Sequence, residues 1–211
     1  MDLPANTIER ITKIYGYLDA LAEREVDFVS SKELAEAVGT TDHTIRKDVS
    51  LLKITGYTRK GYCVRSLKGE LAKKLELDKE RKACIVGLGR LGTALLDYEK
   101  AKQDGFKIVA GFDCSINKLE RIRASIDVFS MSELENIIKG RNIDLGIITV
   151  PAKAAQEVAD QLIAAGIKGI LNFSPAKIVV PKNIIYVDMD FTNALRFMAV
   201  KFITKKEAPR P

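Results

Sequence analysis

The sequence is poor in cysteine and has no long apolar run. Its three cysteines, Cys63, Cys84 and Cys114, are odd in number and far apart, which matches neither a disulfide framework nor a metal-binding cluster. No apolar run approaches the roughly 20 residues that a membrane-spanning helix needs. The first residues, MDLPANTIERI, lack the basic, apolar and small-residue order of a secretory signal peptide. We therefore expect a cytoplasmic protein with reduced thiols, no metal and no membrane partner.

Acidic side chains are nearly absent from one stretch of the first half. Residues 1–78 carry 13 basic and 13 acidic side chains, although the full chain has a net charge of +6. Between His43 and Gly69 a single acid, Asp48, stands against seven basic residues. A solvated lysine-rich surface would interleave acids, so this concentration predicts an anionic partner. The seven are Arg46, Lys47, Lys53, Arg59, Lys60, Arg65 and Lys68.

The spacing of apolar residues in the first half is helical. Apolar residues recur every three or four positions over residues 8–21, which predicts a first helix with one buried stripe. In the stretch SSKELAEAVG, Ser30 and Glu33 have the spacing of a capping box that begins a second helix. Gly39 can adopt the left-handed conformation that ends it.

A third helix and a hairpin complete the expected N-terminal domain. Thr40 or Thr41 can cap a helix over about residues 42–53, and two short helices joined by a glycine turn predict a helix-turn-helix. The stretch TGYTRKGYCV, residues 55–64, predicts a β-hairpin with a basic tip, which would be the wing of a winged helix. A charged helix over residues 67–77 then leads to the second half.

This arrangement favours DNA as the anionic partner. The third helix would enter a major groove while the wing reaches neighbouring phosphates. Bare helical hairpins are common, so the prediction depends on the basic clustering and the wing. The residues assigned to DNA are Lys32, Thr41, Thr44, Arg46, Lys47, Arg59 and Lys60.

Beyond residue 78 the pattern changes to short apolar runs that alternate with amphipathic helices. Such alternation predicts an α/β fold with a parallel sheet covered on both faces. About 130 residues follow the boundary, which is enough for one mononucleotide-binding half and little more. The expected strands are residues 83–86, 107–112, 127–129, 145–150, 169–172 and 184–187.

A dinucleotide-binding motif lies between the first of these strands and the following helix. Gly87, Gly89 and Gly92 form G-x-G-x-x-G, in which the first permits a tight turn, the second admits a pyrophosphate and the third packs helix on strand. Asp113 ends the second strand, where its carboxylate would accept hydrogen bonds from a ribose and disfavour an added 2′-phosphate. We therefore predict NADH and NAD+ as ligands, while Lys118 leaves NADP open.

Further cofactor contacts are expected in the motif loop and at the carboxyl ends of the fourth and fifth strands. Ligands of open α/β sheets bind at that edge, so residues there would line the nicotinamide side. With the motif glycines and Asp113, the assigned residues are Leu88, Arg90, Leu91, Val150, Pro151 and Asn172.

No catalytic apparatus accompanies this site. A hydride-transferring enzyme needs a substrate domain and usually a proton-handling group near the nicotinamide. The one histidine, His43, lies in the third helix, and Tyr98 with Lys153 fits no catalytic motif. We therefore predict a sensor without catalytic residues. The alternative is a small NAD-dependent oxidoreductase with an appended helical domain.

Several stretches, in order along the chain, resemble the redox-sensing transcriptional repressor family Rex: SSKELAEAVG, IRKD, GLGRLG with ALLDY, VPAKAAQEVADQLIAAGIKGILNFSP and VDMDF. The resemblance implies a homodimer in which a C-terminal helix, residues 190–203, swaps onto the partner. It also implies that NADH closes the dimer and releases palindromic operator DNA, while NAD+ competes without doing so. By position, Tyr98 and Asp190 would belong to the switch, and Asp190 and Phe191 would reach the partner's nicotinamide pocket.

With the boundary near residue 78, we expect residues 1–78 to form a winged-helix domain and residues 79–188 a Rossmann domain. The resemblance adds residues 189–211 as a swapped helix with a basic tail. The terminal helix carries apolar side chains that need a partner, because an exposed apolar stripe is unfavourable in water. Folding back onto its own domain is the alternative. These side chains are Phe191, Leu195, Met198, Ala199 and Phe202.

The chain departs from the family pattern at two places. Gly16 stands where a typical Rex has an arginine that pairs with the partner's switch aspartate, so Arg10 or Lys13 would have to substitute. In addition, SLLKITGYTRKGY replaces the Tyr-Phe-Gly and glycine-rich wing of typical members, which puts the operator sequence and the DNA affinity in doubt.

Overall fold

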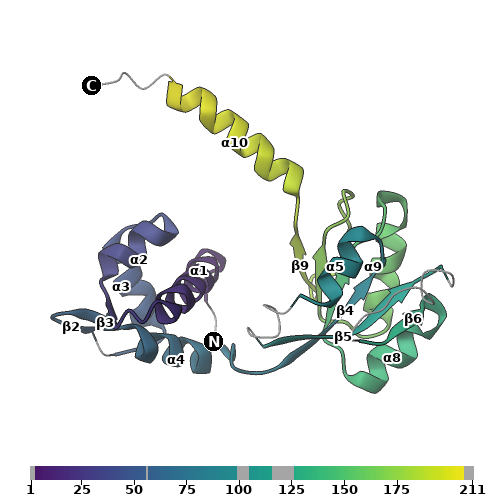
Figure 1. Cartoon of the computed structure of the whole chain (residues 1–211), viewed down its shortest axis with the longest axis horizontal. Helices are drawn as coiled ribbons and strands as arrows, with labels where there is room; N and C mark the ends of the chain where they lie inside the picture. Colours follow the sequence, from purple (N-terminus) through teal and green to yellow (C-terminus); the bar gives the residue numbers. More distant parts are fainter. Residues whose placement is uncertain (1–2, 56, 99–104, 116–125, 207–211) are drawn as a thin grey trace. The chain divides into compact units, whose positions relative to one another are not determined.

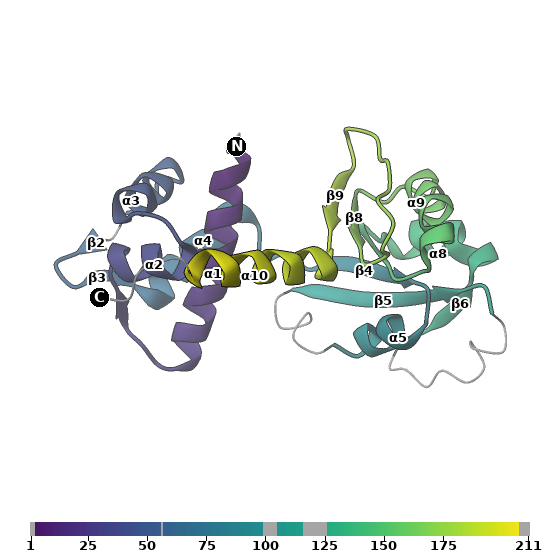
Figure 2. The same cartoon turned by 90° about the horizontal axis from the view of Figure 1, so that it is seen from above.

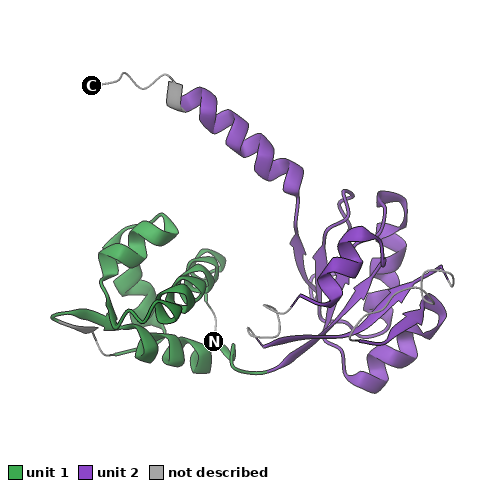
Figure 3. Ribbon diagram, viewed as in Figure 1, with its two compact units in different colours: residues 1–79 green, residues 80–211 purple. Residues whose placement is uncertain are grey.

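The structure of the chain, a computed structural model, describes residues 3–55, 57–98, 105–115 and 126–206. It divides into two compact units, Met1–Lys79 and Glu80–Pro211 (Figure 3). The first is mainly helical, and the second is a parallel sheet with helices on both faces (Figure 1).

The first unit contains the predicted helix-turn-helix and wing. Its helices are α1 (Ala5–Glu23), α2 (Ser31–Val38), α3 (Asp42–Leu51) and α4 (Val64–Leu75). Strands β2 (Tyr57–Thr58) and β3 (Gly61–Cys63) form the expected hairpin, and β1 (Phe28–Val29) adds a third antiparallel strand beside β3. The sequence did not indicate β1, because two residues are too few to show alternation. The core includes Ile11, Ile14, Leu18, Leu34, Ile45, Val49 and Leu71.

The capping box that begins α2 is confirmed. The backbone N–H of Glu33 donates to Ser30 Oγ at 3.1 Å, and the Ser30 N–H donates to Glu33 Oε2 at 2.8 Å. Hydrogen bonds from Ser30 also lower the pKa of the Glu33 carboxyl. Two helix-terminal N–H groups are thereby satisfied before the chain enters the α2–α3 turn.

The turn between α2 and α3 also follows the sequence. Gly39 ends α2 with a φ of 72°, a left-handed conformation that costs glycine little. Of the two threonines that could cap α3, the structure uses Thr41, whose Oγ1 accepts from the Thr44 N–H at 3.2 Å. Ile45 and Val49 then face the core, which directs Arg46 and Lys47 to the surface.

The second unit holds a six-stranded sheet in the order β6-β5-β4-β7-β8-β9, with every neighbouring pair parallel. All six expected strands are present, so the α/β fold class is confirmed. The expectation of one mononucleotide-binding half with little more was wrong: renumbered along the sheet, the order is the complete 3-2-1-4-5-6 of a Rossmann fold. The strands are β4 (Arg81–Val86), β5 (Phe106–Asp113), β6 (Val128–Ser130), β7 (Leu145–Ile148), β8 (Gly169–Asn172) and β9 (Ile185–Asp188).

Helices cover the two faces of this sheet unequally. Helix α5 (Arg90–Leu96) lies on one side, whereas α8 (Leu134–Arg141) and α9 (Ala155–Ala164) lie on the other (Figure 2). Short 3-10 turns, Met131–Glu133 and Ala152–Ala154, precede α8 and α9. The α5 side of β7, β8 and β9 has little cover, because right-handed crossovers place the connections that lead to these strands on the α8 and α9 side.

The last helix, α10 (Phe191–Lys206), follows β9 without folding back onto the sheet (Figure 1). Every residue from 191 to 204 is exposed, including Phe191, Leu195, Met198 and Phe202 of the predicted stripe. The structure therefore differs from the alternative, in which this helix folds back onto its own domain.

We predict opposite stability effects for two glycine substitutions in the first unit. An added Cβ meets nothing within 4 Å at either Gly16 or Gly39. Gly16 lies inside α1, so Gly16→Ala should raise the free energy of unfolding by about 0.5–1 kcal/mol. Gly39→Ala should lower it by about 1–2 kcal/mol, because alanine must adopt a positive φ. Urea unfolding followed by circular dichroism measures both, and a stabilising Gly39→Ala would contradict the argument.

Candidate nucleotide and nucleic-acid sites

The three motif glycines meet different surroundings. Gly87 has a φ of +98°, and a Cβ there would lie 2.6 Å from Val150 Cγ1. A Cβ on Gly92 would lie 2.1 Å from the carbonyl oxygen of Gly87, so only glycine lets α5 approach the strand so closely. Gly89, which precedes α5, has nothing within 4 Å of its added Cβ. The chain's own packing thus requires two glycines, and the third faces open space where a pyrophosphate would fit.

Thr149 supports this loop and was missed in the sequence. Its Oγ1 lies 2.7 Å from the carbonyl oxygen of Gly87 and 3.1 Å from that of Val86, where the hydroxyl donates. Thr149 follows the last residue of β7, the strand paired with β4, so the strand order would have been needed to place it. It fixes the loop beneath the open space at Gly89.

Asp113 lies where a ribose-binding carboxylate is expected. It is buried at the end of β5, and its oxygens accept the backbone N–H groups of Leu88 at 2.8 Å and Ser115 at 2.9 Å. A carboxylate can accept several hydrogen bonds through its two oxygens. The Leu88 side chain packs in the core, so its connection to the site is through its N–H.

The remaining assigned residues divide into exposed and buried ones. Arg90, Leu91 and Pro151 are exposed, and Val150 is half-buried. Asn172 is fully buried, and its side-chain amide is hydrogen-bonded within the turn that follows β8.

The hydrogen bonds of Asn172 hold that turn in place. Asn172 Nδ2 donates to the carbonyl oxygen of Ala176 at 2.8 Å, and its Oδ1 accepts the N–H of Ser174 at 2.9 Å. In this conformation the side chain shapes the turn at the carboxyl edge of β8. Its direct contact with a nicotinamide stays a prediction.

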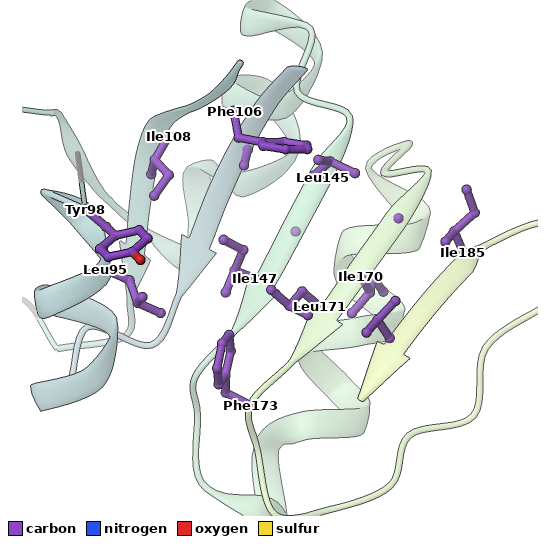
Figure 4. A pocket seen from close by; sticks show the side chains of 14 residues that line it. Leu95, Tyr98, Phe106, Ile108, Leu145, Ile147, Ile170, Leu171, Phe173 and Ile185 are labelled. Atoms are coloured by element: carbon purple, nitrogen blue, oxygen red, sulfur yellow. The ribbon is translucent and has the colours of Figure 1, made fainter. Parts of the chain in front are cut away.

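Tyr98 lines a pocket of about 500 Å³ on the weakly covered face of the sheet (Figure 4). The lining is apolar apart from its phenol, with Leu95 beside it and Ile147, Leu171 and Phe173 along the strands.

Asp190 and Phe191 line another pocket, at the start of α10. Asp190 Oδ1 accepts the Asn193 N–H at 2.8 Å there. Phe173 borders both pockets, but Tyr98 and Asp190 line different ones, so a single chain does not bring the two predicted switch residues into one pocket.

All residues assigned to DNA lie in the first unit. Thr41 uses its hydroxyl to cap α3, and Lys60 lies on the wing with its Nζ 5.6 Å from the centre of the Phe28 ring. Lys32 on α2, Arg46 and Lys47 on α3, and Arg59 and Lys60 on the wing are exposed.

An ion pair missed in the sequence fixes α3 against α1. Asp48 points inward and is 2% exposed, and Arg10 donates to both of its oxygens, at 2.7 and 2.9 Å. Thr7 Oγ1 donates to the same carboxylate at 3.1 Å. The hydrogen bonds of Arg10 to the Asp48 carboxylate raise the pKa of its guanidinium. Arg10 is thus engaged within its own unit, which disfavours it as the substitute for the arginine absent at Gly16.

The cysteines show no sign of a shared site. All three are free, with Cys84 buried, Cys63 half-buried and Cys114 exposed. Burial raises the pKa of the Cys84 thiol to about 12, so it stays protonated. In the described ranges no cluster of three or more His, Cys, Asp or Glu residues is placed to bind a metal ion. None of the described helices has the length and hydropathy to cross a bilayer.

Comparison with known proteins identifies relatives over nearly the whole chain. One family model, described as a putative DNA-binding protein N-terminus, matches residues 2–50, and another, described as a CoA binding domain, matches residues 78–176. The redox-sensing transcriptional repressor Rex of Listeria welshimeri is 38% identical over 194 residues, covering 92% of this chain and 90% of the relative. The Rex protein of Oenococcus oeni is 37% identical over 199 residues, with the same coverage of 92% and 90%.

Solved structures of a Rex-family repressor, RSP, are similar in fold as well. RSP in complex with NADH is 31% identical with a TM-score of 0.85, covering 98% of this chain and 97% of RSP. RSP in complex with NAD+ and operator DNA is 32% identical with a TM-score of 0.85, covering 98% and 95%.

We predict that Gly89→Ala and Gly92→Ala separate ligand binding from folding. Gly89→Ala fills open space, so NADH affinity should fall about tenfold or more with an unchanged melting temperature. Gly92→Ala forces α5 away from the loop and should also cost about 1–3 kcal/mol of stability. Calorimetric titration with NADH and thermal unfolding measure the two effects. Wild-type NADH affinity in Gly89→Ala would exclude this space as the pyrophosphate site.

Proposed function

Because the chain belongs to the Rex family of redox-sensing transcriptional repressors, we propose that it represses transcription by binding operator DNA and senses the ratio of NADH to NAD+. The observation that carries this proposal is the likeness, over 98% of the chain, to a repressor solved with NADH and with NAD+ and operator DNA. A capped recognition helix and a dinucleotide loop in one chain support it independently.

The residues present fit a bound NADH or NAD+. The open space at Gly89 would take the pyrophosphate, with Arg90 and Leu91 beside it. Asp113, held by two N–H groups, would accept the ribose hydroxyls and repel a 2′-phosphate, which favours NAD over NADP. Lys118, which left NADP open, lies outside the described residues. Val150 and Pro151 follow β7 at the edge where the nicotinamide would lie.

We propose that the working form is a homodimer. Apolar side chains surround α10: Phe191, Leu195, Met198 and Phe202 form one stripe, while Phe197, Val200 and Ile203 lie on other sides. An exposed apolar stripe with further large apolar side chains beside it is unfavourable in water and marks an interaction surface. The apolar pocket on the α5 side of the sheet also needs cover. A second copy supplies both surfaces at once.

In this proposal, residues 1–78 bind DNA, residues 79–188 bind the cofactor, and residues 189–211 form the swapped helix and its tail. Residues 207–211 of the basic tail lie outside the described ones. Tyr98 and the partner's Asp190 would form the switch, and Phe191 would approach the partner's nicotinamide.

NADH and NAD+ differ in the charge of the nicotinamide ring. The neutral ring of NADH suits an apolar surface at Phe191, whereas the pyridinium of NAD+ does not. Each tenfold preference of a ligand for one dimer state over the other equals about 1.4 kcal/mol. NADH would therefore favour a closed dimer whose two recognition helices no longer match successive major grooves.

We further propose that the protein performs no hydride transfer and works in the cytoplasm, where operator DNA and nicotinamide pools meet. The one histidine, His43, lies on α3 in the first unit, and no assigned residue at the Gly89 loop handles protons. Steady oxidation of NADH with carbonyl compounds, followed by absorbance, would instead support the oxidoreductase alternative.

A gel shift on palindromic duplexes tests repressor and sensor together. The protein should retard the duplex alone and with NAD+, NADH should release it, and NADPH should act only at much higher concentration. Asp113→Ala should keep the wild-type DNA affinity but fail to respond to NADH. Retardation that no nicotinamide nucleotide changes would refute the sensing function.

Dimerisation is tested on α10. Met198→Glu places a charge in the apolar stripe and should weaken the dimer about tenfold or more. The control Asn193→Glu, on the opposite side of the helix, should change dimerisation much less. Analytical ultracentrifugation over a range of concentrations measures both. A wild-type monomer, or equal effects of the two substitutions, would contradict the proposed swap.

A further inference from the structure

Helix α3 presents one acidic side chain to solvent. Of its two acids, Asp48 is buried against α1, whereas Asp42 is 45% exposed at the N-terminal end of the helix. Arg46 and Lys47 lie on the same exposed surface. DNA phosphates would repel a carboxylate at such a place whatever the base sequence, so Asp42 is electrostatically unfavourable on a DNA-binding surface. A gain elsewhere has to offset this repulsion.

Asp42 pairs with Arg46 and accepts a backbone hydrogen bond of its own helix. Its Oδ2 lies 2.7 Å from Arg46 Nη2, one helical turn further on, and its Oδ1 accepts the His43 N–H at 2.8 Å. Arg46 Nη1 donates to Ser31 Oγ at 3.3 Å, and Ser31 is a buried residue of α2. The guanidinium of Arg46 is thus held from its own helix and from the neighbouring one.

Holding an arginine changes what it recognises. A freely moving guanidinium pairs with whichever phosphate it meets, because charge attraction has little directional preference. A guanidinium has five N–H groups in a rigid plane, and those not used by Asp42 and Ser31 keep a fixed direction. The oxygen and nitrogen acceptors of guanine in the major groove match this planar fork.

We propose that Asp42 is a specificity-determining residue of the DNA site: it fixes Arg46 as a reader of guanine and suppresses binding to DNA of other sequence. This inference rests on the proposed DNA-binding function. It explains why an acid lies on a surface that otherwise collects positive charge.

The experiment compares full-length wild type with Asp42→Asn and Asp42→Ala. A duplex selected by wild type from a randomised library is the specific probe, and unselected library duplexes are the non-specific one. In both variants, affinity for the unselected duplexes should rise about threefold. Replacement of the critical guanine by 7-deazaguanine, which lacks N7, should weaken wild type about tenfold and the variants far less.

Two controls separate this role from general electrostatics and from folding. Glu135→Ala removes an exposed acid from the pair with Lys139 on α8, so it changes the net charge equally but should leave the specific-to-unselected ratio unchanged. NADH affinity and circular dichroism should match wild type in all variants. An unchanged ratio in Asp42→Ala would overturn the inference, whereas a wild type that selects no duplex would overturn the proposed function itself.

Discussion

The second unit depends on the contact between Gly92 at the start of α5 and the carbonyl oxygen of Gly87. An added Cβ would lie 2.1 Å from that oxygen, so no other residue allows the helix this close to the sheet. The contact lies beside β4 and β7, the strands between which the chain order reverses. Thr149 and Asp113 bind the same loop from neighbouring strands, so the sheet itself determines the shape of the nucleotide site.

Features encoded in neighbouring residues could be predicted from the sequence. The capping box of Ser30 and Glu33, the left-handed Gly39 and the apolar strand runs are short-range patterns, and the structure contains each of them. Thr149 and the Arg10–Asp48 pair could not be predicted, because each joins positions that only the fold brings together. The complete strand order was missed because β9 follows β8 without the helix that usually marks a crossover.

The two units carry the two functions expected of a sensor, one in each unit. In the first, the core residues Ile45 and Val49 orient α3, so that its polar surface is presented to solvent. In the second, the sheet offers a nucleotide loop at one edge and an uncovered apolar face. The exposed helix α10 supplies apolar surface that a single chain does not use. In the proposed homodimer, a second copy covers these exposed surfaces.

The ion pair between the half-buried Arg10 and the buried Asp48 also constrains which substitutions this sequence tolerates. Loss of Arg10 leaves the buried Asp48 carboxylate without its counter-charge, which costs about 3–5 kcal/mol, a large part of the stability of a small domain. Loss of Asp48 costs less, because the Arg10 side chain is 24% exposed and can be solvated. Arg10 therefore cannot be lost while Asp48 is kept, although the two positions lie 38 residues apart. Substitutions on the solvent-facing surface of α3 can therefore change what the helix recognises without disturbing its packing, provided that Asp48 is kept.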